Sequence, residues 1–320
     1  MTVERGLVHG SEGGVYQVVL DSGEQVDASL RGRVKREARV GDRVVIGDSV
    51  DVRRDADGSV TIEAVHPRRT QVIRRGPGGR RAKVVAANVD RLVAVVAARR
   101  PAPRQALIDR LLVVGEVNRL EIVLVVNKQD LLAGAEGGEG AGEKGAEELR
   151  ALVELYRDLG YPVLETSARD GRGMESLRGF LCRGISALVG PSGAGKSTLL
   201  NAIQPGLSLR TGGVSLKAGR GRHTTVSARL LTLACGGVVA DTPGFSDVGV
   251  WGVEARELEG CFPEFSLYRE GCRFRGCTHL HEPGCRVRGA LEEGVIDPGR
   301  YESYRILFQE AQEADRRLFR

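Results

Sequence analysis

The stretch Gly190 to Ser197 reads GPSGAGKS, which matches the pattern G-x-x-x-x-G-K-[ST]. The apolar run Ile185–Val189 precedes it, and a helical pattern follows it. A Gly-rich turn between a strand and a helix aims its backbone N–H groups at phosphate oxygens, and the loop lysine, Lys196, reaches the terminal phosphates. We therefore predict a phosphate-binding loop, and a Gly-rich turn without a ligand is the less economical alternative.

A second motif, NKQD at Asn127 to Asp130, comes before the phosphate loop in the chain, whereas ordinary GTPases carry it after that loop. It follows the apolar run Ile122–Val126, so it stands at the carboxyl end of a predicted strand, where α/β sheets bind ligands. The Asp130 carboxylate can accept hydrogen bonds from N1–H and the 2-amino group of guanine, which adenine does not offer. The motif predicts a guanine-reading site, although four such residues alone would also suit a helix N-cap.

Two further stretches fit the same base-reading site. We expect Asn127 to support the base edge and the adjacent loop, and the Lys128 side chain to cover the face of the ring. The sequence TSA at Thr166–Ala168 follows another strand-like run and is expected to contact guanine O6 through a backbone N–H. The base site is thus predicted to combine two loops that are separate in sequence.

A third motif, DTPG at Asp241 to Gly244, ends the apolar run Val238–Ala240. An aspartate at this position holds Mg²⁺, and a glycine N–H there meets the γ-phosphate. The next residue is Phe245, where many GTPases place a glutamine that orients the attacking water. The motifs thus run base reader, phosphate loop, metal motif, which is the order of a circularly permuted GTPase domain.

The stretch GRHTT, which ends at Thr225, lies between the phosphate-loop helix and the metal motif, where a nucleotide-sensing switch belongs. Either Thr224 or Thr225 would bind Mg²⁺ when GTP is present. His223 could position the attacking water in place of a glutamine, but an inert surface histidine is an equally good interpretation.

The predicted site residues fall into two overlapping sets. Those predicted to bind GTP are Asn127, Lys128, Asp130, Ser167, Ala168, Gly190, Pro191, Ser192, Gly193, Ala194, Gly195, Lys196, Ser197, Thr198, Asp241 and Gly244. Those predicted to bind Mg²⁺ are Ser197, Thr224, Thr225 and Asp241.

The last four of the six cysteines crowd together near the C-terminal end. This segment offers the Cys₃His set of a closed tetrahedral zinc site, from Cys272, Cys277, His279 and Cys285. No position stays open for water, so one structural zinc is expected. The chain length and apolar content predict a core that folds without help from disulfides. Free buried cysteines are the alternative to a metal. The rival ligands are His281 and Cys261.

Composition and patterning predict a multidomain protein. The 320 residues carry a net charge of +5 and include 41% apolar residues, which suits a globular protein in the cytoplasm with no membrane partner. Short strands with Gly turns predict a β-barrel over residues 1–68. It is either an OB-fold of the kind that binds oligonucleotides or a structural barrel without a ligand. An Arg-rich stretch without acidic residues predicts a basic linker over residues 69–86. A permuted α/β GTPase domain is predicted over residues 87–250, and a mainly α zinc domain over residues 251–320.

Together these elements resemble the RsgA family, also called YjeQ or YloQ, whose members are circularly permuted GTPases that act in maturation of the bacterial small ribosomal subunit. The resemblance covers nearly the whole chain and rests on NKQD, TSA, GPSGAGKST, GRHTT, DTPGF and the cysteine cluster in this order. It implies an OB-fold barrel, zinc at the four residues named above, a catalytic role for His223, and GTPase activity stimulated by the 30S subunit. A Gly/Glu-rich insertion over Gly134–Gly145, predicted as a loop, departs from the family but contains no motif residue.

Three functions remain in competition. The favoured one is a monomeric GTPase that binds GTP and GDP, the 30S subunit and its 16S rRNA, and that hydrolyses GTP during late subunit maturation. The second is a non-catalytic RNA-binding module that uses GTP as an occupancy signal, which Phe245 makes conceivable. The third is a P-loop ATPase with an accidental NKxD.

Overall fold

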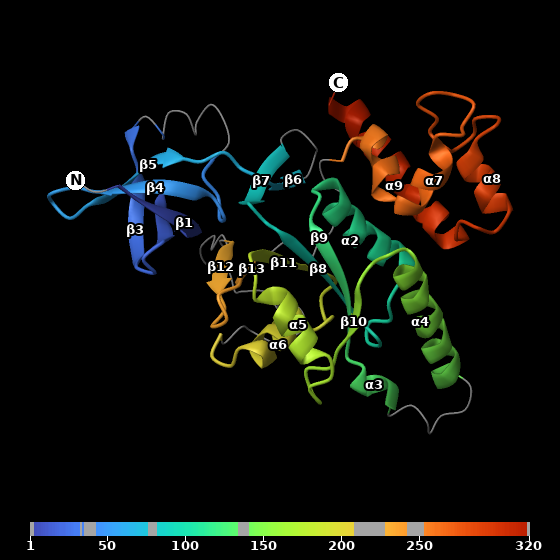
Figure 1. The fold of residues 1–320 in the computed structure, drawn as a ribbon, viewed down its shortest axis with the longest axis horizontal. Helices are drawn as coiled ribbons and strands as arrows, with labels where there is room; N and C mark the ends of the chain where they lie inside the picture. The colour runs from blue at the N-terminus through green and yellow to red at the C-terminus, as the bar shows by residue number, and fades with distance from the viewer. Residues whose placement is uncertain are drawn as a thin grey trace, which may run out of the picture.

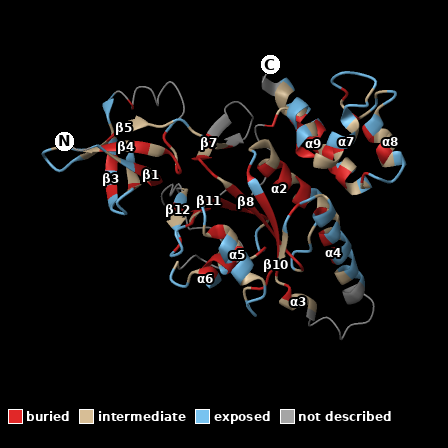
Figure 2. Cartoon of the chain, in the orientation of Figure 1, coloured by how far each residue is buried: buried red, intermediate tan, exposed pale blue. Residues whose placement is uncertain are grey.

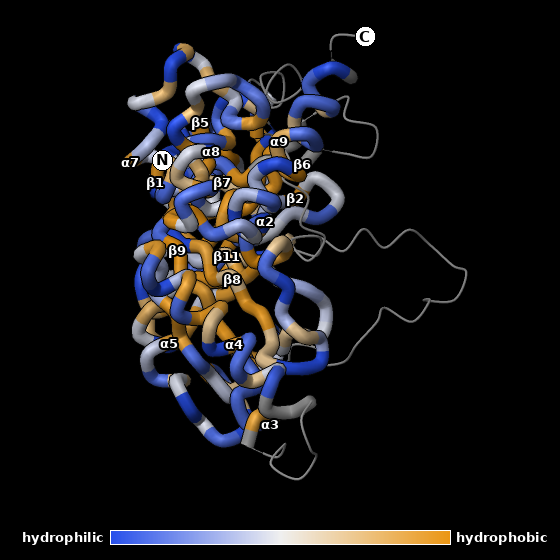
Figure 3. The backbone as a smooth tube through the Cα atoms, turned by 90° about the vertical axis from the view of Figure 1, so that its right-hand side faces the viewer, coloured by the Kyte–Doolittle hydropathy of each residue, from blue (hydrophilic) through white to orange (hydrophobic). Residues whose placement is uncertain are grey.

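The computed structural model describes residues 3–32, 34, 43–75, 82–133, 141–207, 228–241 and 253–318. Figure 1 shows a central sheet with its helices, flanked by an N-terminal barrel and a C-terminal group of helices. Buried residues concentrate inside each of these parts (Figure 2). The apolar stretches of chain run through the interior along β8 (Arg91–Ala97), β9 (Glu121–Asn127) and β11 (Ile185–Val189) (Figure 3).

Among the described residues, five strands form the N-terminal barrel. They are β1 (Val3–Glu12), β2 (Val15–Leu20), β3 (Gln25–Leu30), β4 (Ser49–Arg54) and β5 (Val60–Val65). They pair in the order β1-β2-β3-β5-β4, and β1 also pairs with β4, which closes the ring. Alternating apolar residues such as Val8, Val18 and Ile62 fill the interior. This closed five-stranded order is the predicted OB-fold arrangement.

The central sheet has the order β10-β9-β8-β11-β13-β12. All its neighbours are parallel except β12, which runs antiparallel to β13. Its remaining strands are β10 (Val163–Glu165), β12 (Arg229–Thr232) and β13 (Val238–Asp241). Its helices are α2 (Gln105–Val117), α3 (Asp130–Ala133), α4 (Ala141–Asp158), α5 (Met174–Leu181) and α6 (Lys196–Ile203).

Apolar cores cover both faces of this sheet. Along β8, Leu92 and Val96 belong to the core that contains buried side chains of α2 and α4. Val93 and Val95 belong to the core that contains buried side chains of α5 and α6. Successive residues of a strand point to opposite faces, so a strand buried on both sides is expected to be apolar, as β8 is from Leu92 to Ala97.

Two predictions about connecting segments need correction. The basic stretch at residues 69–86, predicted as a linker, contains most of an antiparallel hairpin of β6 (Gln71–Arg75) and β7 (Ala82–Ala87). Val72 and Val84 of this hairpin are buried, so its apolar residues, rather than its arginines, decided its structure. The predicted loop over residues 134–145 was also partly wrong, because α4 already begins at Ala141, where helix-forming Ala, Glu and Lys are frequent. Residues 134–140 lie outside the described ranges.

The barrel joins the central sheet directly. Gly10 of β1 pairs with Arg229 of β12, so one hydrogen-bonded sheet runs from the barrel into the central sheet. On the hairpin side, the N–H of Ala87 donates to the carbonyl of Ile46 at 2.9 Å. A Cβ at Gly47 would lie only 2.0 Å from the Ala87 carbonyl oxygen, so a glycine is needed for this close approach.

The C-terminal part packs around aromatic side chains. Its elements are η1 (Ala255–Cys261), η2 (Pro263–Phe265), α7 (Ser266–Arg269), α8 (Arg286–Glu292) and α9 (Pro298–Leu318). Phe262, Phe265 and Tyr304 stack edge to face or offset in its core. Val113 of α2 belongs to the same core, so this part docks on the helical layer of the central sheet.

Among the described residues, no helix combines the length and the apolarity needed to cross a membrane.

A buried ion network holds that docking interface together. The fully buried guanidinium of Arg300, on α9, donates to Asp109 of α2 at 2.7 Å and forks onto Glu264 of η2 at 2.7 and 3.0 Å. Arg300 also lies 4.5 Å from the ring centroid of Phe262. Tyr156 of α4 donates to the same Asp109 at 2.5 Å. One cation thus compensates two carboxylates from different parts of the chain.

Candidate functional site

The predicted phosphate loop lies between β11 and α6 and depends on glycines with positive φ. A Cβ at Gly190, where φ is +144°, would lie 2.0 Å from the carbonyl oxygen of Val95 on β8. A Cβ at Gly195, where φ is +95°, would lie 2.4 Å from Nδ2 of Asn127. Neither position accepts a side chain, and the backbone therefore wraps closely against the ends of β8 and β9.

Lys196 is folded back across this loop. Its ammonium donates to the carbonyl oxygens of Gly190 at 2.6 Å and Pro191 at 3.1 Å. Ser197 is half-buried in the first turn of α6, while Ser192 and Thr198 are exposed. The ammonium therefore lies on the loop backbone at the N-terminus of α6, where anions are favoured.

Asn127 links the two predicted halves of the site. This side chain is 2% exposed at the end of β9. Its Nδ2 donates to the carbonyl of Ala194 in the phosphate loop at 3.0 Å, and its Oδ1 accepts from the hydroxyl of Thr166 at 3.3 Å. The NKQD motif, the TSA stretch and the phosphate loop therefore meet at one edge of the sheet.

The Asp130 carboxylate stands beside Ser167 at that edge. The Ser167 hydroxyl donates to Oδ1 of Asp130 at 2.9 Å, and the Arg169 guanidinium lies 3.9 Å from Oδ2. The N–H of Gln129 donates to the Thr166 carbonyl at 3.1 Å, which ties the two loops together through their backbones. Ala168 follows directly, half-buried. A carboxylate fixed in this way can read a donor–donor edge such as that of guanine.

Lys128 has an anchor that the sequence did not suggest. The residue adopts a left-handed conformation, with φ of +64°, and its ammonium donates to the carbonyl of Arg100 at 2.7 Å. Arg100 lies in the loop between β8 and α2, and the next residue, Pro101, lies 3.7 Å from where a Cβ of Gly193 would be. The β8–α2 loop therefore forms a third wall of the site.

The third motif is described only in part. Ala240 pairs with Ala187, which places the backbone of Asp241 at the end of β13 beside the strand that leads into the phosphate loop. The other predicted residues of this region lie outside the described ranges, namely His223, Thr224, Thr225 and Gly244.

The predicted zinc ligands come together in one cluster. Their ligand atoms lie within 4.8 Å of one another, in the set Cys272, Cys277, His279 and Cys285. His279 is 1% exposed, and its Nδ1 lies 3.6 Å from the sulfur of Cys272 and 3.3 Å from that of Cys285. Burial raises the pKa of the Cys277 thiol to about 12, so a cation is needed to keep that sulfur ionised. Three sulfurs and one imidazole nitrogen at this spacing fit a closed tetrahedral zinc site.

Neither rival ligand joins this cluster. His281 is exposed, and its N–H donates to the Glu282 carboxylate at 3.2 Å. Cys261 is 3% exposed and packs in the C-terminal apolar core.

Two carboxylates that sequence reasoning missed support the cluster. Oε2 of Glu259 lies 3.4 Å from Nε2 of His279, the ring nitrogen that faces away from the sulfurs. A carboxylate at that nitrogen orients a metal-binding imidazole. Although burial would raise it, hydrogen bonds from Thr278 and neighbouring N–H groups lower the pKa of Glu282 to about 2. Glu259 lies 20 positions before His279, and no local spacing signals that contact.

Comparison with known proteins agrees with this geometry. The family model described as RsgA GTPase matches residues 65–251. The small ribosomal subunit biogenesis GTPase RsgA of Gemmatimonas aurantiaca is 45% identical over 306 residues, covering 95% of this chain and 96% of the relative. The crystal structure of YjeQ from Thermotoga maritima has a TM-score of 0.79 at 36% identity and covers 97% of this chain and 99% of its own.

A second solved structure is that of YloQ, described as a circularly permuted GTPase. It has a TM-score of 0.75 at 29% identity and covers 98% of this chain and 96% of its own. Together with the matched family model, these relatives account for the fold, the permuted motif order and almost the full length. The chain therefore belongs to the RsgA GTPase family.

Proposed function

We propose that this protein is a cytoplasmic, monomeric GTPase that binds the 30S ribosomal subunit and its 16S rRNA and hydrolyses GTP during late subunit maturation. The observation that carries the proposal is the contact of Asn127 with the phosphate loop, which joins the base reader and the phosphate loop into one site. Two relatives are named small ribosomal subunit biogenesis GTPase RsgA, and each matches more than nine-tenths of this chain.

Different residues of the site would bind the base and the phosphates of the nucleotide. Asp130, held by Ser167, would accept the N1–H and 2-amino hydrogens of guanine, and the Ala168 N–H would donate to O6. The phosphate-loop N–H groups would donate to the β-phosphate. Lys196 would exchange its bonds with the carbonyls of Gly190 and Pro191 for bonds with phosphate oxygens.

The protein would bind two metal ions, one Mg²⁺ with the nucleotide and one structural Zn²⁺. Ser197, Asp241 and one of Thr224 and Thr225 would hold Mg²⁺, which supplies positive charge next to the β- and γ-phosphate oxygens. Cys272, Cys277, His279 and Cys285 would hold one Zn²⁺, which supplies a cross-link for a segment with little core of its own. His223 would position the attacking water, because Phe245 has no polar atom with which to do so.

We assign RNA contacts to the parts that flank the GTPase unit at residues 87–250. These are the barrel at residues 1–68, the basic stretch at 69–86, and the zinc domain at 251–320. The segment around the cysteine cluster, from the end of α7 to the start of α8, carries several exposed arginines, namely Arg269, Arg273, Arg275 and Arg286. Arginine forks match phosphate oxygens, which makes a backbone-directed RNA contact the expected use of this surface.

The experiment that tests this proposal is GTP turnover by the full chain alone, with purified 30S subunits, and with purified 50S subunits as the matched control. We expect 30S subunits to raise turnover and 50S subunits to leave it unchanged. The presence of Phe245 favours one other candidate, a non-catalytic RNA-binding module that uses GTP as an occupancy signal. Such a module would bind GTP and 30S subunits yet show no turnover in any of the three conditions.

A further inference from the structure

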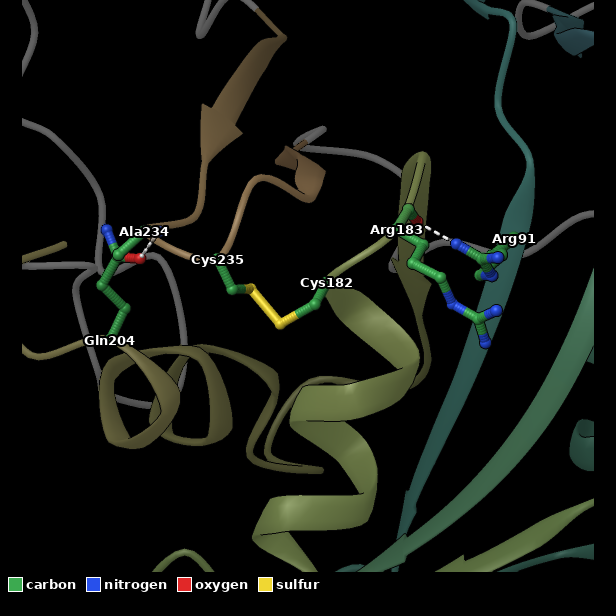
Figure 4. The surroundings of a disulfide bond; sticks show 6 residues. All are labelled: Arg91, Cys182, Arg183, Gln204, Ala234 and Cys235. Carbon is green, nitrogen blue, oxygen red and sulfur yellow. Dashed lines mark hydrogen bonds between the residues drawn. A yellow bond between two sulfur atoms is a disulfide. The ribbon is translucent and has the colours of Figure 1, made fainter.

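A disulfide joins Cys182 to Cys235 (Figure 4). The two residues precede β11 and β13, so they lie near the edge where these parallel strands begin, opposite the edge where the phosphate loop follows β11. Cys182 directly follows α5, and Cys235 lies 53 positions later, in the turn between β12 and β13. Cys235 is exposed and Cys182 is half-buried, so small thiols and disulfides can reach the bond. The pair is separate from the zinc cluster, whose three cysteines do not form disulfides.

The same turn makes three further contacts with the framework around the phosphate loop. The N–H of Ala234 donates to the side chain of Gln204, the residue after α6, at 2.6 Å (Figure 4). The N–H of Val238 donates to the Gly184 carbonyl at 2.9 Å. A Cβ at Gly237 would lie 1.9 Å from the Leu181 carbonyl oxygen, so the turn packs directly on the end of α5. The disulfide therefore adds a covalent link to a turn that is already docked.

The hairpin held by this turn connects the nucleotide edge to the barrel. β13 runs from the turn to Asp241 and pairs with β11, the strand that leads into the phosphate loop. β12 follows the GRHTT stretch in sequence and pairs with β1 of the barrel through Arg229 and Gly10. Any displacement of β12 and β13 along the sheet must move the turn relative to α5. A covalent bond between the turn and α5 opposes that displacement.

We propose that Cys182 and Cys235 form a thiol–disulfide modification site whose oxidation clamps the β12–β13 hairpin and slows nucleotide release. The proposal rests on the nucleotide site proposed above and adds a means of regulating it. Disulfides in a reducing cytoplasm are usually transient and redox-sensing, which fits a pair with an exposed Cys235 at the turn of the hairpin. Zinc-bound thiolates are not needed for this role.

The oxidant is a low-molecular-weight disulfide such as oxidised glutathione. The Cys235 thiolate attacks one sulfur of the oxidant, forms a mixed disulfide and releases one small thiolate. The Cys182 thiolate then attacks the Cys235 sulfur and releases the second small thiolate. The two protein thiols lose two protons and two electrons in total, and the oxidant, reduced by two electrons, leaves as two thiols. Excess small thiol reverses both steps.

The test compares the zinc-loaded full chain after incubation with oxidised glutathione or with dithiothreitol. Non-reducing peptide mapping should find Cys182 linked to Cys235 only in the oxidised sample, with zinc content equal in both samples. Release of a fluorescent GDP analogue, chased with excess GDP, should be at least about fivefold slower in the oxidised sample. Dithiothreitol should restore the faster rate.

Three variants complete the test. Cys182→Ser and Cys235→Ser should each release GDP at the reduced rate under both conditions, whereas Cys261→Ser, a buried cysteine outside the pair, should keep the full redox difference. Absence of the Cys182–Cys235 peptide after oxidation would overturn the proposal, as would equal release rates in samples that contain and lack it. Failure of the GDP analogue to bind either sample would contradict the nucleotide site itself, and this inference with it.

Discussion

The side-chain amide of Asn127 donates a hydrogen bond to the carbonyl oxygen of Ala194, a residue 67 positions later in the chain, across 3.0 Å. Asn127 ends β9, and Ala194 lies in the loop that follows β11. These strands are separated in the sheet only by β8, and both end at the same edge. The contact depends on strand ends that meet at one edge of the sheet, and not on chain order. Permutation therefore reverses the motifs in sequence and keeps them together in space.

The first prediction concerns that contact. Asn127→Ala leaves the buried carbonyl of Ala194 without its donor, which costs about 1–3 kcal/mol and loosens the phosphate loop. We expect GDP affinity, measured by titration calorimetry, to fall by about tenfold, corresponding to about 1.4 kcal/mol. Asn118→Ala is the matched control, because Asn118 makes a similar side-chain bond to the Val114 carbonyl at the other end of the sheet. Equal GDP affinity in the two variants would contradict the prediction.

The second prediction concerns the metal cluster. The purified wild-type chain should contain about one zinc, Cys277→Ser should contain almost none, and Cys261→Ser should retain it. Glu259→Gln replaces the carboxylate beside Nε2 of His279, and we expect it to weaken zinc affinity by about tenfold in a chelator competition assay. Zinc loss from Cys261→Ser would show that Cys261, not the predicted set alone, holds the metal.

The third prediction concerns the interface between α2 and α9. Arg300→Met leaves Asp109 and Glu264 without their shared buried cation, so we expect the free energy of unfolding to fall by about 3–5 kcal/mol. Arg305→Met is the control on the same helix, because Arg305 pairs with Glu302 at the surface. Its denaturation midpoint should match that of the wild type. A comparably small effect of both substitutions would show that the buried network does not hold the interface.

The fourth prediction concerns pH. Burial lowers the pKa of His9 below its usual value of 6.5, although a hydrogen bond to the backbone of Leu230 on β12 partly opposes this. The folded protein therefore binds fewer protons at His9 than the unfolded chain does. The resulting stability is present above pH 6.5 and is lost as the pH falls from that value through the lower pKa of the folded state. We expect His9→Gln to lose less thermal stability than the wild type between pH 7.5 and 5.5.

Loss of zinc in acid would affect the wild type and the His9→Gln variant alike, so the comparison isolates the imidazole. An identical decrease in the two melting temperatures would show that His9 does not contribute to the acid sensitivity of the barrel–sheet junction.

Much of this molecule could be predicted from local sequence patterns. The phosphate loop, the base reader and the cysteine cluster each have a fixed spacing, because a turn or a metal demands particular residues at particular steps. Apolar runs such as Leu92–Val96 identify strands that are buried on both faces. These signals were sufficient for the fold class and for the adjacency of Asn127, Asp130 and Ser167.

What the sequence did not reveal depends on contacts between distant residues. Arg300 is an arginine in a charged helix, and only the pairing with Asp109, 191 positions away, explains its complete burial. Cys182 and Cys235 lack any motif, so their link follows only from the docking of a turn on α5. The arginines of residues 69–86 suggested a linker because the apolar residues of the hairpin form two short groups, Val72–Ile73 and Val84–Ala87, separated by ten mostly Gly and basic residues.

The most direct test of the central claim is the nucleotide preference of Asp130→Asn. If the permuted motifs form one guanine site, an amide at this position can still accept from N1–H, but its NH₂ group faces the 2-amino donor of guanine and repels it. The same NH₂ group can donate to the oxygen that xanthine carries at position 2. We therefore predict that GTP affinity falls by at least about a hundredfold and that the xanthosine triphosphate affinity rises above it, while Asp170→Asn, in the neighbouring loop, keeps the wild-type preference. Unchanged preference for GTP in the Asp130→Asn variant would contradict the account.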